Sequence, residues 1–267
     1  MSIFMVYLAL GACAGILAGL LGIGGGLVLV AALAWLLPRH GVPADAAMHV
    51  SLASSMGSIV LTAAASARAH HKRGSVLWPT VAWLVPGVLV GGLLGTRVAI
   101  GLEGDALRWC VAAYCYVVAA QMLLGGRTQA ADGDVVPRGI AYSAAGGGIG
   151  ALSAIVGIGG GSMTVPLLVW RGVAPVRAIG TSSATGIFIG LGGALGYALQ
   201  APAGALPLAG SIGYVYLPAA LSVAIASVLA APYGTRLAHA LSGQALKRVF
   251  AGFLVLVGSS VAWSALG

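Results

Sequence analysis

The chain has 267 residues, of which 60% are hydrophobic, 43 are glycine and only 7% are charged. A soluble domain carries about 25% charged residues and about 7% glycine, so this composition excludes an ordinary soluble enzyme and a disordered chain. It predicts a polytopic membrane protein. The formal net charge of +8 then reflects basic residues that flank membrane helices, and nucleic-acid binding is not expected.

The charged positions divide the sequence into long uncharged stretches, which mark the expected membrane segments. In chain order these are residues 1–38, 46–67, 74–96, 109–126, 139–170, 178–235 and 249–267. A helix that crosses a bilayer needs about 20 residues, so four of the stretches fit one crossing each: 46–67, 74–96, 109–126 and 249–267. The stretch 178–235 fits two crossings, divided near residues 200–204. Two stretches, 1–38 and 139–170, are too long for one straight helix. We expect the first of them to be retained in the mature protein, because it lacks the basic start of a signal peptide.

These two long stretches share a sequence, and the similarity continues through both halves of the chain. Gly22-Ile-Gly-Gly-Gly26 recurs 135 residues later as Gly157-Ile-Gly-Gly-Gly161. Gly95-Thr-Arg-Val-Ala99 recurs 139 residues later as Gly234-Thr-Arg-Leu-Ala238. The sequence therefore predicts two homologous membrane repeats, residues 1–126 and 138–267, joined by a polar linker over 127–137. Such repeats are common in secondary transporters.

The basic residues predict how the repeats lie in the membrane. If each glycine-centred stretch folds back as a hairpin, 10 of the 13 Lys and Arg residues fall on one side; if each crosses once, the split is 8 to 5. The positive-inside rule favours the hairpins. Each repeat then holds one hairpin and three crossings, so the two repeats are inverted. The second arms, 27–37 and 162–170, reach about 14 to 17 Å, which predicts re-entrant hairpins with their glycine loops near the midplane; hairpins of two full crossings are the alternative.

The glycine loops are candidate binding sites for a small anion. A glycine run inside hydrocarbon leaves backbone N–H groups without helical partners, and the partly positive start of the next helix faces the same space. The candidate residues are Gly22, Gly24, Gly25 and Gly26 in the first loop, and Gly157, Gly159, Gly160, Gly161, Ser162 and Thr164 in and after the second. The alternative is that such glycines only permit close helix packing, which we expect for Gly11, Gly15, Gly19, Gly91 and Gly95.

Hydroxyl groups cluster where the next helices begin. His49-Val-Ser-Leu-Ala-Ser-Ser55 opens one of these helices and Thr181-Ser-Ser-Ala-Thr185 opens the other. The side chains of Ser51, Thr181, Ser182 and Ser183 either complete the donor set for an anion or bond to backbone carbonyls, and both interpretations stay open. His49 is the one titratable side chain in this region. It either carries a proton or contacts the anion, or it is a neutral, hydrogen-bonded histidine.

The acidic residues argue against a cation as substrate. Asp45, Glu103, Asp105, Asp132 and Asp134 all fall in expected loops. Cation carriers and proton pumps usually place a carboxylate within the membrane, so its absence from the expected spans favours an anion and leaves no acidic residue for proton coupling.

An intramembrane enzyme is a weak alternative. Gly161-Ser162 can suggest a serine nucleophile, but the second half's only histidine, His239, falls in an expected basic loop. The cysteines Cys13, Cys110 and Cys115 lie inside apolar runs without CxxC spacing, and neither a metal nor a cofactor is expected.

The paired glycine motifs resemble the signature of the TauE/SafE family of membrane transporters, which is followed by apolar residues and Pro-x-Leu. The second half keeps this pattern in Gly159-Gly-Gly-Ser-Met-Thr-Val-Pro166-Leu-Leu, and Gly180-Thr-Ser182 matches a further family motif. The loop Arg68-Ala-His-His-Lys-Arg-Gly74 is similar to the family's basic cytoplasmic loop. The first half departs from the pattern, with Ala31 where the second has Pro166 and His49-Val50 where it has Gly180-Thr181, which makes His49 an asymmetric determinant.

The resemblance implies transport of small sulfur-containing or organic anions, such as sulfite, sulfoacetate and other sulfonates. We therefore expect an all-α, multi-pass protein of the cell inner membrane, built from two inverted halves that each hold one glycine-broken hairpin and three membrane helices. It is expected to work by alternating access around a site between the glycine loops, and a proton is the candidate coupling ion. A passive anion channel that uses the same residues is the alternative.

Overall fold

The structure, a computed structural model, describes residues 3–21, 25–124, 135–202, 204–205, 208–240 and 243–266. It is almost entirely helical. Its helices are α1 (Ile3–Leu21), α2 (Gly26–Leu36), the 3-10 helix η1 (Leu37–His40), α3 (Ala44–Lys72), α4 (Trp78–Ile100), α5 (Gly104–Leu124), α6 (Ile140–Val156), α7 (Gly161–Trp170), α8 (Pro175–Leu199), α9 (Leu217–Ala240) and α10 (Gly243–Trp263). Two short strands, β1 (Ser211–Ile212) and β2 (Val215–Tyr216), form an antiparallel ribbon before α9.

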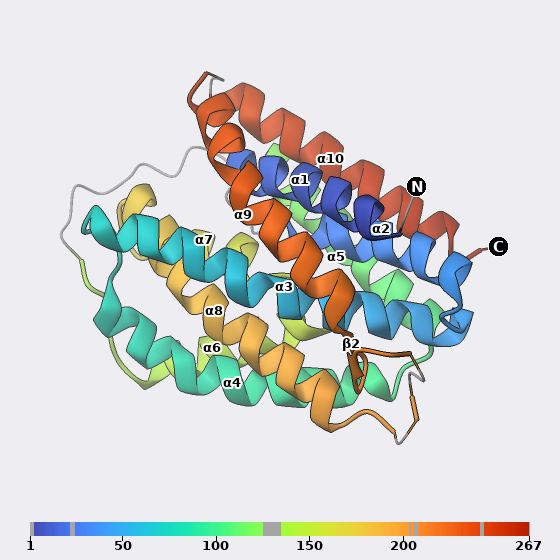
Figure 1. The fold of residues 1–267 in the computed structure, drawn as a ribbon. Helices are drawn as coiled ribbons and strands as arrows, with labels where there is room; N and C mark the ends of the chain where they lie inside the picture. The colour runs from blue at the N-terminus through green and yellow to red at the C-terminus, as the bar shows by residue number, and fades with distance from the viewer. Residues whose placement is uncertain are drawn as a thin grey trace.

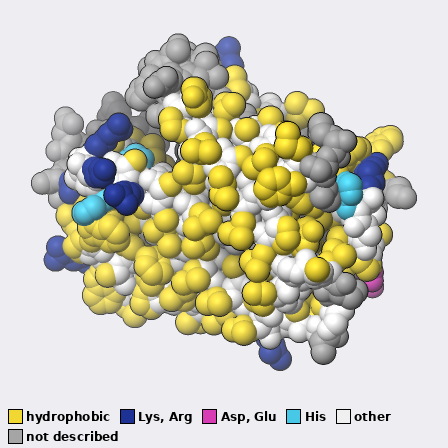
Figure 2. All heavy atoms as spheres, in the orientation of Figure 1, with side chains coloured by type: hydrophobic (Ala, Val, Ile, Leu, Met, Phe, Trp, Pro, Cys, Tyr) yellow, Lys and Arg dark blue, Asp and Glu magenta, His cyan; other side chains and the backbone are white. Residues whose placement is uncertain are grey.

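The helices have the length and surface of a multi-pass membrane protein. Within the described ranges, α3, α4 and α8 are each long and apolar enough to cross a membrane, and the other helices except α5 contain shorter apolar segments. Figure 2 shows a largely hydrophobic face, with Lys and Arg side chains gathered mainly at one end. That end, on the left in Figure 1, is where α3 ends and α8 begins. We call it the basic end.

Both long stretches break at their glycine motifs, as the sequence predicts. The first is divided into α1 and α2, and the second into α6 and α7. In Figure 1, α1 begins and α2 ends towards the right, where α3 begins, whereas α7 ends on the left, where α8 begins. The second arms are short, 11 residues in α2 and 10 in α7.

The segment between α8 and α9 is longer than expected. The sequence predicts a turn near 200–204, but helix resumes only at Leu217, after the β-ribbon. Further turn-forming residues extend the break: Gly204, Gly210 and Gly213 all adopt positive φ, a conformation that favours glycine. The sequence analysis placed the turn at residues 200–204 only, so it did not predict the two strands that follow.

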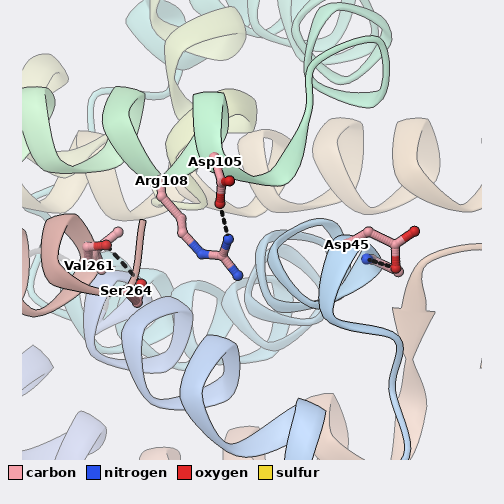
Figure 3. A network of polar contacts seen from close by, with 6 residues as sticks. Asp45, Asp105, Arg108, Val261 and Ser264 are labelled. Atoms are coloured by element: carbon pink, nitrogen blue, oxygen red, sulfur yellow. Dashed lines mark hydrogen bonds and ion pairs between the residues drawn. The ribbon is translucent and has the colours of Figure 1, made fainter. Parts of the chain in front are cut away.

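Two acidic residues, Asp45 and Asp105, lie at helix starts, as Figure 3 shows. Asp45 is in the first turn of α3, and Asp105 is in the first turn of α5, where it pairs with Arg108. The sequence placed both in loops; a carboxylate at a helix start is favourable because the helix N-terminus is partly positive. Asp132 and Asp134 lie outside the described residues.

Glycines let α6 and α4 approach each other closely. A Cβ built on Gly146 would lie 2.5 Å from the carbonyl oxygen of Leu84, and one on Gly150 would lie even closer to that of Val88. Real Cβ atoms essentially never come within 3.0 Å of another heavy atom, so these two positions accept only glycine without movement of a helix.

The same contact recurs between α1 and α9. A Cβ on Gly11 would lie 2.5 Å from the carbonyl oxygen of Val223, and one on Gly15 would collide with Ser227. These four residues are the repeat equivalents of the four on α6 and α4, at offsets of 135 and 139 residues. The sequence repeat is therefore also a repeat of helix contacts, and the packing role expected for Gly11 and Gly15 is confirmed.

Gly91 and Gly95 also pack, because their Cβ positions would collide with the backbone of Gly147 and Ala151 on α6. The surroundings of Gly19 lie outside the described part of the chain. At the centre, α3 packs on its repeat equivalent α8, and α5 packs on α10. This scaffold carries the two helix breaks.

The close α4–α6 contact predicts opposite effects for two neighbouring glycines. Gly150→Ala should lower stability by about 1 to 3 kcal/mol because its methyl group meets a backbone carbonyl. Gly148→Ala, on the same helix with nothing within 4 Å of its Cβ, should gain about 0.5 to 1 kcal/mol from the better helix propensity of alanine. The midpoint of thermal unfolding in detergent measures both, and shifts in the same direction would contradict the packing interpretation.

Candidate functional site

Glycine in the left-handed conformation begins both second arms. Gly25, the N-cap of α2, has φ 64° and ψ 0°, and Gly160, the N-cap of α7, has φ 70° and ψ 0°. The two are equivalent in the repeat. A residue with a Cβ is strained in this conformation, so the local geometry explains why both motifs carry glycine here. The predicted site residues Gly22 and Gly24 lie outside the described residues.

The two glycine loops meet at one serine. The Ser55 hydroxyl, fully buried on α3, lies 3.2 Å from the carbonyl oxygen of Gly26 and 2.9 Å from that of Gly157. A Cβ on Gly26 would lie 2.6 Å from the same Gly157 oxygen. Ser55 therefore donates a hydrogen bond between the loops of the two repeats, and the loops approach too closely for a side chain.

The second loop is packed equally tightly. A Cβ on Gly159 would lie 3.2 Å from Ile59, and one on Gly160 would collide with Ile189. Gly157 ends α6 with φ 77°, and its N–H donates to Ser153 O at 2.8 Å. The backbone of the loop thus packs directly on α3 and α8, because its glycines have no side chains that would lie between them.

Hydrogen-bond donors without acceptors gather beside Gly160. The amides of Met163 and Thr164 in α7 donate to Gly160 O at 3.1 and 2.8 Å. The amide of Gly161 precedes them in the buried first turn, where backbone N–H groups have no intrahelical partner. The hydroxyls of Ser153 and Thr164 are fully buried and have no hydrogen-bond partner within the described ranges. The Ser153 oxygen lies 3.3 Å from the Cβ position of Gly160.

Buried polar groups in proteins almost always have partners, so two unpaired hydroxyls at one helix start call for an explanation. Neutral N–H and O–H groups in such an arrangement suit an anion, which accepts hydrogen bonds and does not require Lys or Arg. The first repeat has Ala18 and Leu29 at the positions equivalent to Ser153 and Thr164. The hydroxyl donors therefore belong to the second repeat alone.

Ser162 is oriented differently from Thr164. Its hydroxyl forms a hydrogen bond with the Tyr114 hydroxyl of α5, and its side chain is half-buried. It also lines a cavity of about 430 Å³ beside α7. Of the two predicted hydroxyl residues after the loop, Thr164 faces the protein interior and Ser162 faces α5.

The structure places His49 against the end of α4. Its Nε2 lies 3.1 Å from the carbonyl oxygens of both Ala99 and Leu102, and its ring stacks on Tyr214 at a centroid distance of 5.1 Å. A carbonyl oxygen only accepts, so Nε2 carries the proton. Burial, and then the charge of Asp45, raise the pKa of Tyr214, which keeps its phenol neutral. His49 is thus hydrogen-bonded through Nε2, about 9 Å along α3 from the serine that joins the loops. Its buried Nδ1 has no partner among the described residues.

Two hydroxyl groups on the central helices α3 and α8 accept hydrogen bonds from backbone N–H groups that lie just before neighbouring helices. Thr181 of α8 accepts a hydrogen bond from Leu77 N at 3.0 Å, just before α4, and donates to Arg177 O at 2.7 Å. Ser54 of α3 accepts one from Tyr216 N at 3.1 Å, just before α9. Thr181, predicted as a binding residue, thus supports the first residues of a neighbouring helix.

The other predicted hydroxyls differ in their partners. Ser51 donates to Ala47 O at 2.7 Å, one turn earlier on α3. Ser183 bonds Ile179 O and the Ser66 hydroxyl of α3, both at 3.0 Å. Ser182 is buried. Ser55 and Ser153 were not among the predicted site residues, although Ser55 belongs to the hydroxyl cluster that begins at His49.

Comparison with known proteins gives two matches. The family model described as Sulfite exporter TauE/SafE matches residues 7–261. A "Probable membrane transporter protein" of Haemophilus influenzae (strain ATCC 51907 / DSM 11121 / KW20 / Rd) is 34% identical over 256 residues, which cover 95% of this chain and 96% of that protein. No solved structure matches.

Ser55 offers a test of the contact between the loops. Ser55→Ala should destabilise the protein by about 1 to 3 kcal/mol, because it removes the donor shared by two buried carbonyl groups. Ser58→Ala, one turn away, removes only a local bond to Ser55 O and should cost about 1 kcal/mol or less. Thermal unfolding in detergent compares the variants, and equal losses would show that the bond between the loops contributes nothing of its own.

Proposed function

Because this chain belongs to the Sulfite exporter TauE/SafE family of membrane transporters, we propose that it moves small organic or sulfur-containing anions by alternating access around a site at its glycine loops. The family is one of transporters and not of enzymes. The substrates of the proposal are sulfite, sulfoacetate and related sulfonates. Each presents several oxygens that accept hydrogen bonds.

The observation that carries the proposal is the set of unpaired donors beside Gly160. Ser153 and Thr164 supply two buried hydroxyls, and the start of α7 supplies backbone N–H groups at the same place. Neither a basic nor an acidic side chain is among these donors, which fits an anion that must be released again after binding. We assign the first contacts with substrate to this loop, with the predicted residues Gly159, Gly161 and Ser162 around it.

The first loop completes the proposed site from the other repeat. Gly25 and Gly26 begin α2 as Gly160 and Gly161 begin α7, and Ser55 joins the loops. Gly22 and Gly24 belong to the same proposal through their sequence alone. A site shared by two repeats is what alternating access between them requires.

We also propose that α1–α2 and α6–α7 are re-entrant hairpins in inverted repeats. The short arms α2 and α7 reach about 15 to 17 Å, half the thickness of the hydrocarbon, so their loops lie near the midplane. Support comes from the opposite ends at which the two hairpins open in Figure 1 and from the gathering of Lys and Arg at one of them in Figure 2. The basic end is then cytoplasmic.

Transport should depend on the glycine at the start of α7. Gly160→Ala should abolish uptake of radiolabelled sulfite into proteoliposomes, because the methyl group strains the backbone and meets Ile189 beside the donors. Gly74→Ala is the matched control: its φ is 68°, but nothing lies within 4 Å of its Cβ, so it carries similar strain away from the loops. Normal sulfite flux in Gly160→Ala would refute the loop site. Uptake against the sulfite gradient under an imposed proton gradient separates a carrier from a passive channel.

The hairpins predict which positions share a side of the membrane. Arg138→Cys and Arg171→Cys, before α6 and after α7, should both react with a membrane-impermeant maleimide from the cytoplasmic side. Arg39→Cys, after α2, should react only from the outside. Reaction of the first two positions from opposite sides would show that residues 139–170 cross the membrane and would exclude the hairpin.

A further inference from the structure

The cavity beside α7 separates this helix from α5. It has a volume of about 430 Å³, and its lining includes Ser162 and Met163 at the start of α7, Trp170 at the end of α7 and Gln121 near the end of α5. The Tyr114–Ser162 hydrogen bond joins the two helices near the loop. From Ser162 to Trp170, α7 rises about 12 Å, so the cavity extends from the glycine loop to the basic end of the molecule.

The equivalent space in the first repeat is filled. The counterparts of Ser162 and Tyr114 are Leu27 and Phe253. Leu27 is buried in a hydrophobic cluster that includes Leu254 of α10; Phe253, Tyr114 and Met163 all pack against this cluster, whereas the Ser162 side chain is half-buried and lines the cavity. As a result α2 contacts α10 directly, whereas α5 and α7, their equivalents, scarcely touch along their backbones.

This difference between equivalent pairs of helices is the basis of the inference. We propose that the α5–α7 cavity is a water-filled vestibule through which a small anion passes between the basic end and Ser162, a proposal that rests on the transport function above. The structure is then the state open to the basic end, with the counterpart vestibule between α2 and α10 closed. Gln121 becomes a substrate-contacting residue and Tyr114 a residue that positions Ser162, both on α5, a helix that the sequence did not connect with the site.

The polar groups of the vestibule fit an anion in transit. Gln121 is exposed near the mouth and presents an amide N–H₂ donor, and the Ser162 hydroxyl lies at the inner end. Arg171 directly follows Trp170, which lines the cavity, and its guanidinium lies 5.7 Å from the ring centroid of Tyr142, so a fixed positive charge lies at the basic end of the vestibule. A charge in this position raises the local concentration of anions. The apolar remainder of the wall, from Met163 outward, holds the anion only weakly.

Cysteine labelling tests the vestibule directly. In a chain with Cys13, Cys110 and Cys115 replaced by Ala, Met163→Cys is compared with its repeat counterpart Val28→Cys. The probe is 2-sulfonatoethyl methanethiosulfonate, a charged sulfonate that does not cross membranes. Modification of Met163→Cys should be about 10-fold faster or more, because a thiol reacts according to its access to water. The reaction should come from the side on which Arg171→Cys reacts, and sulfite should slow it.

The outcomes separate the vestibule from the transport proposal. Equal rates at the two positions, or modification of Met163→Cys only by the uncharged N-ethylmaleimide, would overturn the vestibule and identify a lipid-filled groove. Gln121→Cys gives a second reading at the mouth if Met163→Cys does not fold. Fast, sided modification in a protein that carries no anion in proteoliposomes would support the vestibule while refuting the proposed function.

Discussion

A helix that breaks inside a membrane leaves backbone N–H and C=O groups without helical partners, and in hydrocarbon each such group costs several kcal/mol. With the glycine loops at the midplane, as proposed above, the molecule meets this problem twice. For the carbonyl groups, the Ser55 hydroxyl supplies a hydrogen-bond donor to the carbonyl oxygens of Gly26 and Gly157. On the amide side, the first turn of α7 presents N–H groups that have no intrahelical partner, and the buried hydroxyls of Ser153 and Thr164, unpartnered among the described residues, add two more donors. The arrangement of α3, α8 and the hairpins follows from bringing these groups together.

The scaffold repeats, but the chemistry does not. The close contact of α1 with α9 is the counterpart of that of α6 with α4, down to the glycines that permit it. Where the second repeat has Ser153 and Thr164, the first has Ala18 and Leu29. A duplicated framework therefore supports one polar loop and one apolar loop. The same asymmetry separates α5 from α7 while α10 packs on α2.

The sequence predicted the helices and their breaks well, because apolar run length and glycine placement are local properties. The starts of α2 and α7 lie within one residue of the expected arms. It did not predict hydrogen-bond partners that lie far away in the chain. His49, a candidate for the site, lies against Ala99 and Leu102, which no motif connects with it. Thr181 likewise bonds Leu77 N. A sequence shows which side chains are able to form hydrogen bonds, whereas the packing of the helices decides which groups become their partners.

The central claim is that uncharged donors at the second loop bind a small oxyanion. A thermal-shift experiment on the detergent-purified protein tests it most directly, because a ligand stabilises the state that it binds, by about 2.7 kcal/mol at 100 times its dissociation constant. The panel contains sulfite, sulfoacetate and taurine, with sodium and potassium chloride as cation controls. The account predicts a concentration-dependent rise in the unfolding midpoint with sulfite or a sulfonate, and a smaller rise in a Ser153→Ala, Thr164→Val double variant. A shift caused by the cations alone, or the same shift in the double variant, would contradict it.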